Sequence, residues 1–148
     1  MQARDIMTSP VITIRQDATV AEAAKLMLDR DVSALPVLDD SERLAGILTH
    51  SDFGLSPKFR PLVDNIYSLL GSTTTPEHLE ETAHQVGNRQ VREVMRRNII
   101  TVPEDASIEH IARLMLRAQI HRLPVVTDDR LVGIVTRHDF LKLIAQAA

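Results

Sequence analysis

The chain has 148 residues, of which 44% are hydrophobic and 25% charged, with a formal net charge of −3 and no cysteine. This is enough to bury a core, and the absence of cysteine excludes disulfides and thiolate metal sites. The acidic balance and few aromatic residues disfavour a nucleic-acid partner. No apolar run is long enough to cross a bilayer and the start lacks a signal-peptide pattern, so we expect a cytoplasmic protein without a membrane partner.

In chain order, residues 3–53 resemble residues 91–140, at an offset of 88 residues that falls to 87 after Ser41. Two copies of one unit predict a pseudo-two-fold arrangement. The matched pairs include Met7 and Met95, Ile12 and Ile100, Leu28 and Leu116, Pro36 and Pro124, Gly46 and Gly133, Thr49 and Thr136, and Asp52 and Asp139.

Each copy begins with a short helical turn, at residues 3–7 and 91–95, and continues with a β-branched extended run, at 11–14 and 99–102. A helix follows. Thr19 and Glu22 have the spacing of a capping box, and Ser107 marks the same start in the second copy. Apolar residues then recur at helical spacing on one face of each helix.

A strand comes next in each copy, at residues 34–38 and 122–126, with a proline that indicates a strand start or a sheet edge. An Asp-rich turn leads to an apolar strand, 44–49 or 131–136, and then to a last helix. The order is β-α-β-β-α. We therefore predict an α/β (α+β) fold in which two pseudo-two-fold-related repeats pack around one core.

The domain division we predict is repeat 1 at residues 1–54, an insertion at 55–90 and repeat 2 at 91–148. The insertion is too long for an ordinary connection. Within it, Pro76, a modest stripe of Leu79, Ala83 and Val86, and the closing Gly87 predict a helix near 76–87.

The Thr-x-x-Asp that ends each apolar strand has two interpretations. A helix N-terminus beside a hydroxyl and a carboxylate, here Asp52 or Asp139, suits a phosphate and a ribose. The same spacing is a capping arrangement, in which Thr49 or Thr136 precedes an acid favoured by the helix dipole.

Two β-α-β-β-α copies with Leu-Pro-Val strands and Gly-x-x-Thr-x-x-Asp closely resemble tandem CBS domains, the pair called a Bateman module. The resemblance implies a stand-alone regulatory module rather than an enzyme. It also implies a cleft between the repeats for an adenosine-containing ligand (AMP, ADP, ATP or S-adenosylmethionine), no required cofactor, a disc-like homodimer and an effector protein not yet known.

The resemblance also implies which residues bind the ligand. In the nucleotide-sensing subunit of the AMP-activated protein kinase a His-Arg pair contacts phosphates; here His121 and Arg122 occupy that place, whereas the first copy has Ser33 and Ala34. A solvated, polar strand end is the other interpretation of the second-copy pair. The expected ligand-binding residues are Thr49, Asp52, Thr136, Asp139, His121, Arg122, Arg137, His138, Ile12, Thr13, Ile100 and Thr101, although Ile12 and Ile100 individually fit the core better.

Metal binding and catalysis have little support. The six histidines do not recur between the copies, and neither a nucleophile–base signature nor a P-loop is present. The arginines near residue 92 fit a solvated rim better than a nucleic-acid contact. We therefore expect a nucleotide sensor that works by differential binding, with a ligand-free dimerisation scaffold as the alternative.

Overall fold

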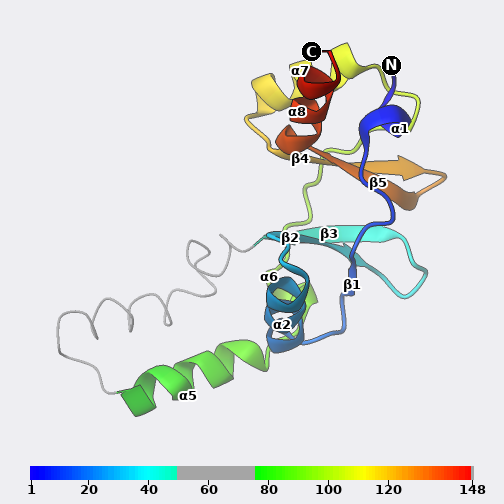
Figure 1. Ribbon diagram of the computed structural model, residues 1–148. Helices are drawn as coiled ribbons and strands as arrows, with labels where there is room; N and C mark the ends of the chain where they lie inside the picture. Colours follow the sequence, from blue (N-terminus) through cyan, green and yellow to red (C-terminus); the bar gives the residue numbers. More distant parts are fainter. Residues whose placement is uncertain (50–75, 148) are drawn as a thin grey trace. The chain divides into compact units, whose positions relative to one another are not determined.

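The computed structural model describes residues 1–49 and 76–147 and divides into two compact units (Figure 1). Unit 1 comprises Met1–Ile12, Glu42–Leu44 and Asn98–Ala148; unit 2 comprises Thr13–Ser41 and Ala45–Arg97. The compact units therefore do not coincide with the sequence repeats. The division into residues 1–54, 55–90 and 91–148 stays a prediction about the repeats.

Unit 2 contains a three-stranded sheet in the order β1-β2-β3, built from Ile14–Arg15, Ala34–Leu38 and Leu44–Thr49. The helices described in unit 2 are α2 (Val20–Arg30), α5 (Pro76–Gly87) and α6 (Val91–Val94). The capping box predicted for α2 is confirmed. The Thr19 hydroxyl accepts from the Glu22 backbone N–H at 3.1 Å, and the Thr19 N–H donates to the Glu22 carboxylate at 2.9 Å.

Proline in β2 did not mark a sheet edge, because β2 lies between β1 and β3. The short β1 explains how the proline is accommodated: its two residues pair in parallel only with Val37 and Leu38, beyond Pro36. The extended run expected at residues 11–14 is thus a strand only from Ile14 onward.

Unit 1 contains α1 (Ala3–Ile6), α7 (Ile108–Ala118), the antiparallel hairpin of β4 (Arg122–Thr127) and β5 (Arg130–Thr136), and α8 (Arg137–Gln146). The turn of the hairpin places Asp128 and Asp129 at φ of 50° and 65°, a left-handed conformation that aspartate tolerates better than most residues. Ser107 caps α7 as predicted, accepting from the His110 N–H at 3.2 Å.

The opening helices of the two repeats are exchanged between the units. The Ala3 N–H of α1 donates to the Ala106 carbonyl at 2.8 Å, within unit 1. The Val91 N–H of α6 donates to the Ala18 carbonyl at 2.8 Å, within unit 2. Each unit therefore needs residues from both repeats to complete its hydrogen bonding.

The two glycines of the apolar strands allow the exchanged segments to approach closely. A Cβ at Gly46 would lie 2.5 Å from the Met95 Sδ and 2.8 Å from the Arg96 carbonyl oxygen, and one at Gly133 would clash with Met7. These two glycine–methionine contacts explain why both residue types recur in the two copies.

Each of the two units has buried apolar residues of its own. Each contains residues of both repeats, so neither repeat forms a unit alone. The buried core of unit 1 is Ala3, Ile6, Val102, Ala106, Ile111, Met115, Leu123, Val125 and Val135. Among the described residues of unit 2, the buried hydrophobic ones are Val20, Ala23, Met27, Leu35, Val37, Leu48, Val86, Val91, Val94 and Met95.

The helix predicted near residues 76–87 is confirmed as α5, and it packs on α2. A Cβ at Gly87 would meet the Ala21 Cβ at 3.2 Å, which shows how closely the two helices approach. The predicted stripe is only partly right, because Val86 and Thr82 are buried whereas Ala83 is exposed. Residues 55–75 of the insertion, and the last helix expected for the first copy, lie outside the described residues.

Candidate functional site

The expected site residues of the second copy gather at one end of the β4–β5 hairpin. Arg122 at the start of β4 is directly opposite Thr136 at the end of β5. The Arg137 N–H donates to the His121 carbonyl oxygen at 3.3 Å, which holds the beginning of α8 against the beginning of β4. The antiparallel pairing therefore brings together residues that lie about fifteen positions apart in the sequence.

Asp139, in the first turn of α8, is the buried charged group of this region, with 1% of its surface exposed. Its Oδ2 accepts from the Thr136 N–H at 2.8 Å and from the Thr136 hydroxyl at 3.3 Å. An acid three residues into a helix that binds the N-cap N–H satisfies an otherwise unpaired donor and interacts favourably with the helix dipole. One oxygen of Asp139 therefore has the capping role.

The other carboxylate oxygen, Oδ1, has different partners. It accepts from the Lys142 Nζ at 2.7 Å and from the Thr8 hydroxyl at 3.2 Å. Both donors are side chains of exposed residues, whereas the Oδ2 partners belong to the helix start itself. The capping and ligand-binding interpretations of Thr-x-x-Asp are thus compatible, because the cap uses Oδ2 and a ligand would bind Oδ1.

Thr8 and Lys142 were not among the residues expected from sequence. Thr8 and Arg96 occupy equivalent places: Thr8 exchanges backbone hydrogen bonds with Ile134, and Arg96 does so with Ile47. The two positions are equivalent, but the residues differ, so the identities between the two copies do not reveal Thr8. For Lys142, a signal was available in its spacing, because a lysine three residues after an aspartate on a helix can form an ion pair.

The extended run of the second copy lies beside β4. Val102 forms a parallel bridge with Val125, and continuing that register places Ile100 and Thr101 level with the first half of β4. Ile100 is 41% exposed, so its assignment to the core is wrong. Thr101 is exposed too. Their role in binding an adenine stays a prediction.

The candidates of the first copy are only partly described. Thr49 ends β3 and is half-buried, and Thr13 directly precedes β1. Ile12 is half-buried and falls in unit 1, so the first copy's own candidates are divided between the units. Asp52 lies outside the described residues. Ligand binding by these residues stays a prediction.

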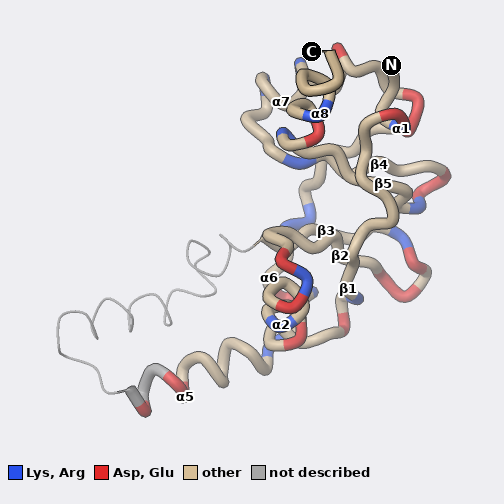
Figure 2. The backbone as a smooth tube through the Cα atoms, in the orientation of Figure 1, with Lys and Arg blue, Asp and Glu red and all other residues tan. Residues whose placement is uncertain are grey.

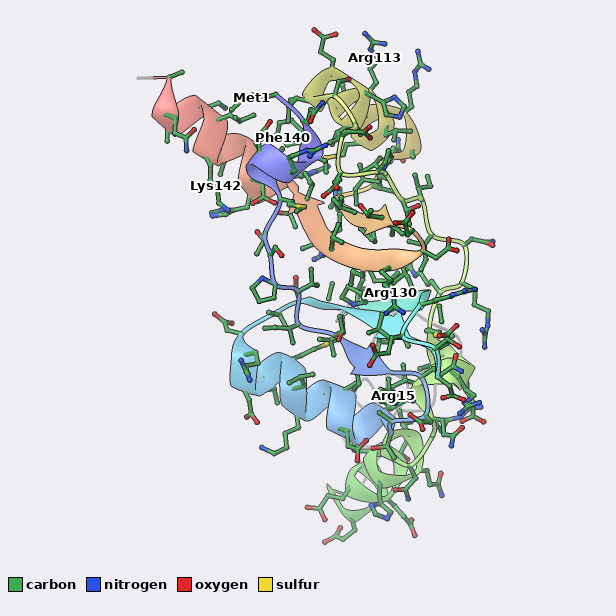
Figure 3. The ribbon with its side chains drawn as sticks, turned by 90° about the vertical axis from the view of Figure 1, so that its right-hand side faces the viewer. Met1, Arg15, Arg113, Arg130, Phe140 and Lys142 are labelled. Carbon is green, nitrogen blue, oxygen red and sulfur yellow. The ribbon has the colours of Figure 1, made fainter. Side chains whose placement is uncertain are left out.

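The cationic residues expected at the hairpin end differ in exposure. Arg122 is half-buried, whereas His121, Arg137 and His138 are exposed. Figure 3 shows the side chains of this region, with Lys142 and Phe140 labelled on α8. Exposure of three of the four agrees with the solvated strand end weighed above, and it also leaves them accessible to an anion.

An apolar groove of about 220 Å³ lies on unit 1 between α7 and α8, lined by Ala112, Met115, Leu116, Arg137 and Phe140. Leu116 is 80% exposed, and Leu28, its equivalent on α2, is 82% exposed. Leu141 and Ile144 of α8 are exposed as well. The two leucines are therefore exposed to nearly the same extent at equivalent positions of the two repeats.

Other kinds of site have little support within residues 1–49 and 76–147. No group of three or more His, Asp or Glu side chains there is arranged to hold a metal ion. The arginines around α6 take part in local contacts, such as Arg89 with Glu93 at 3.9 Å and Arg97 with the Arg92 carbonyl at 2.9 Å. Figure 2 shows basic and acidic positions interspersed along each unit. None of the described helices combines the length and apolarity needed to cross a bilayer.

Comparison with known proteins identifies the family. The model of the CBS domain matches residues 3–53 and again residues 91–146. Hypoxic response protein 1 of Mycobacterium tuberculosis is 32% identical over 149 residues, which cover 99% of this chain and 87% of that protein. Four other curated relatives are 30% to 36% identical, but the chain spans only 22% to 42% of their length.

Two similar solved structures contain adenosine compounds. The CBS domain pair of protein MJ0100, in complex with 5'-methylthioadenosine and S-adenosyl-L-methionine, is 28% identical, with a TM-score of 0.71 and coverage of 100% of this chain and 98% of that one. CBSX2 in complex with AMP is 26% identical, with a TM-score of 0.73 and coverage of 99% and 97%.

Proposed function

Since this chain belongs to the CBS domain family, as a pair of CBS repeats, we propose that it is a regulatory module that senses an adenosine-containing ligand. The observation that supports this most directly is the divided carboxylate of Asp139. Oδ2 caps α8 through Thr136, while Oδ1 contacts donors on exposed residues that a ribose hydroxyl can replace. Two similar CBS pairs bind S-adenosylmethionine with methylthioadenosine, or AMP.

In this proposal a nucleoside binds at the end of the β4–β5 hairpin. Its ribose hydroxyls donate to Asp139, and its phosphates lie near Arg122, whose planar guanidinium suits a bidentate contact with an anion. The adenine contacts the run that contains Ile100 and Thr101. No group in this set activates a nucleophile, so the role we assign is binding and not catalysis.

Signalling would follow from differential affinity. A ligand that favours one conformation of the module shifts the population toward that state, and an effector protein reads the change. The first copy lacks the His-Arg pair and has Ser33 and Ala34 in its place. We therefore expect the second-copy site to bind phosphate-bearing ligands more tightly than any first-copy site.

We also propose that the module is a homodimer. The exposed leucines at equivalent positions, Leu28 and Leu116, and the apolar groove between α7 and α8 favour contact with a second copy through the helices. These same observations support the second candidate function, a dimerisation scaffold in which Asp139 is only a cap.

Isothermal titration calorimetry with AMP, ADP, ATP and S-adenosylmethionine, together with thermal unfolding, separates the two functions. A sensor binds at least one of these compounds with one defined stoichiometry. At a ligand concentration 100 times the Kd, binding adds about 2.7 kcal/mol to the free energy of unfolding. A protein that dimerises but shows neither heat of binding nor a shift in melting temperature with any of the four would be a scaffold.

A further inference from the structure

Lys142 differs from the other donors to Asp139 in its charge. Its Nζ lies 2.7 Å from Oδ1, and its side chain is 48% exposed, whereas the Asp139 side chain is 1% exposed. Asp139 has about four lone-pair directions, and all four are used by donors in this structure. A ribose hydroxyl can therefore reach Oδ1 only when Thr8 or Lys142 gives way.

We propose that Lys142 is a displaceable counter-ion that makes this site select anionic adenosine ligands. The inference rests on the proposed function and adds the class of ligand. Lys142 occupies Oδ1 while the site is empty. When a ribose hydroxyl takes that oxygen, the flexible four-carbon side chain carries Nζ away from Asp139, and the ammonium group then interacts with a phosphate of the ligand.

The charges at the site support this selectivity. Arg122 lies opposite Thr136 at the hairpin end, beside the start of α8, so opening the Lys142–Asp139 pair releases a cation at an end of the unit that already carries an arginine. AMP offers that cation a phosphate. Adenosine has no charged group for the lysine to contact. S-Adenosylmethionine has two cationic groups, a sulfonium and an ammonium, and only one carboxylate. A ligand that opens the Lys142–Asp139 ion pair without giving Lys142 a new anionic partner binds more weakly. A ligand that carries positive charge binds more weakly still, because it repels the lysine.

Substitution of Lys142 by methionine keeps the length of the side chain and removes its charge. Because the lysine is half exposed, the pair contributes no more than a surface ion pair, so its removal should tighten adenosine binding about fivefold. The Kd for AMP should change less than about twofold, because the two effects oppose each other: the variant has no ion pair to open, but it also lacks the contact with the phosphate. S-Adenosylmethionine should tighten at least as much as adenosine. The Lys142→Arg variant should keep the wild-type order.

The control is Lys25→Met. Lys25 forms an ion pair with Asp29 on α2 at 2.7 Å, with side chains 76% and 56% exposed, so this variant loses the same charge away from the site. Calorimetry on the wild type and the three variants, with circular dichroism to confirm folding, measures the ratio of the adenosine Kd to the AMP Kd. The proposal requires that this ratio fall about fivefold in Lys142→Met and stay unchanged in Lys142→Arg and Lys25→Met.

Two results would overturn the proposal. If Lys142→Met melts at a lower temperature but keeps the wild-type ratio of affinities, Lys142 only stabilises α8, and the sensing function survives without this selectivity. If neither the wild type nor Lys142→Met binds AMP, adenosine or S-adenosylmethionine, the sensing function itself fails, and the role of Lys142 fails with it.

Discussion

The two oxygens of the Asp139 carboxylate have different partners, and this predicts different effects for two substitutions at that residue. Asp139→Asn keeps one oxygen, which can remain on the Thr136 N–H and cap α8. Its amide group then faces the Lys142 ammonium, so the ion pair is lost. Asp139→Ala removes both oxygens. We expect the Asp139→Asn variant to keep most of the protein's stability but to bind a ribose more weakly. The Asp139→Ala variant should be less stable and should also bind a ribose more weakly.

The magnitudes follow from the contacts. Loss of the cap destabilises by about 1 kcal/mol, and loss of the half-exposed Lys142 pair by at most about 1 kcal/mol. Thr8 can donate to water instead. Asp139→Ala should therefore lower the free energy of unfolding by about 2 kcal/mol, or roughly 4–8 °C in melting temperature for a chain of this size. Asp139→Asn should lose about half of that. Both should weaken AMP binding roughly 10- to 150-fold, the effect of a lost charge-assisted hydrogen bond.

Glu22→Ala is the matched control, because Glu22 is the capping acid of α2 and binds the Thr19 N–H at 2.9 Å. It should destabilise by about 1 kcal/mol and leave AMP affinity unchanged. Thermal unfolding and calorimetry on the three variants test the reasoning. If Asn and Ala are equally destabilising and neither alters AMP affinity, Asp139 is a cap alone and the assignment of Oδ1 to the ligand is wrong.

Three further predictions concern packing, phosphate binding and assembly. Gly46→Ala should destabilise by about 1–3 kcal/mol in chemical denaturation, because its Cβ would lie 2.8 Å from the Arg96 carbonyl oxygen, which cannot move aside as a side chain can. Gly87→Ala should have a smaller effect, since its Cβ would lie 3.2 Å from the Ala21 Cβ, and equal effects would contradict the close-approach argument. Arg122→Ala should lower the affinity for AMP about tenfold and the affinity for adenosine much less, as measured by calorimetry. Equal losses of affinity would show that Arg122 does not bind the phosphate. Leu116→Glu should yield a monomer in analytical ultracentrifugation with an unchanged melting temperature at low concentration, because the side chain is 80% exposed; an unchanged dimer would exclude this face.

The exchange of the opening helices brings a residue of the first repeat to the candidate site of the second. Thr8 belongs to the first repeat in sequence, yet its hydroxyl donates to the carboxylate of the second repeat at 3.2 Å. Its backbone is held by two hydrogen bonds to Ile134 of β5. Under the proposed function, a ribose that contacts Oδ1 would therefore lie beside the chain segment that follows α1.

Sequence alone determined the local features of this protein. The capping residues Thr19 and Ser107, the helix near residues 76–87 and the β4 and β5 strands were predictable, because each depends on side-chain chemistry within a few residues. The repeat predicted the family. The candidate Asp139 was also found this way, since a threonine and an acid three residues apart form a local motif.

Only the tertiary structure decided which repeat completes which unit and what surrounds Asp139. Thr8 reaches that carboxylate across 131 residues of sequence, and the glycine–methionine contacts depend on the same exchange of helices. Such contacts leave no periodicity in a single sequence, because their energy comes from packing and hydrogen bonding between distant segments. The exposure of Ile100 had the same origin. An apolar residue is buried only if a neighbouring segment covers it, and for Ile100 none of the described segments does so fully.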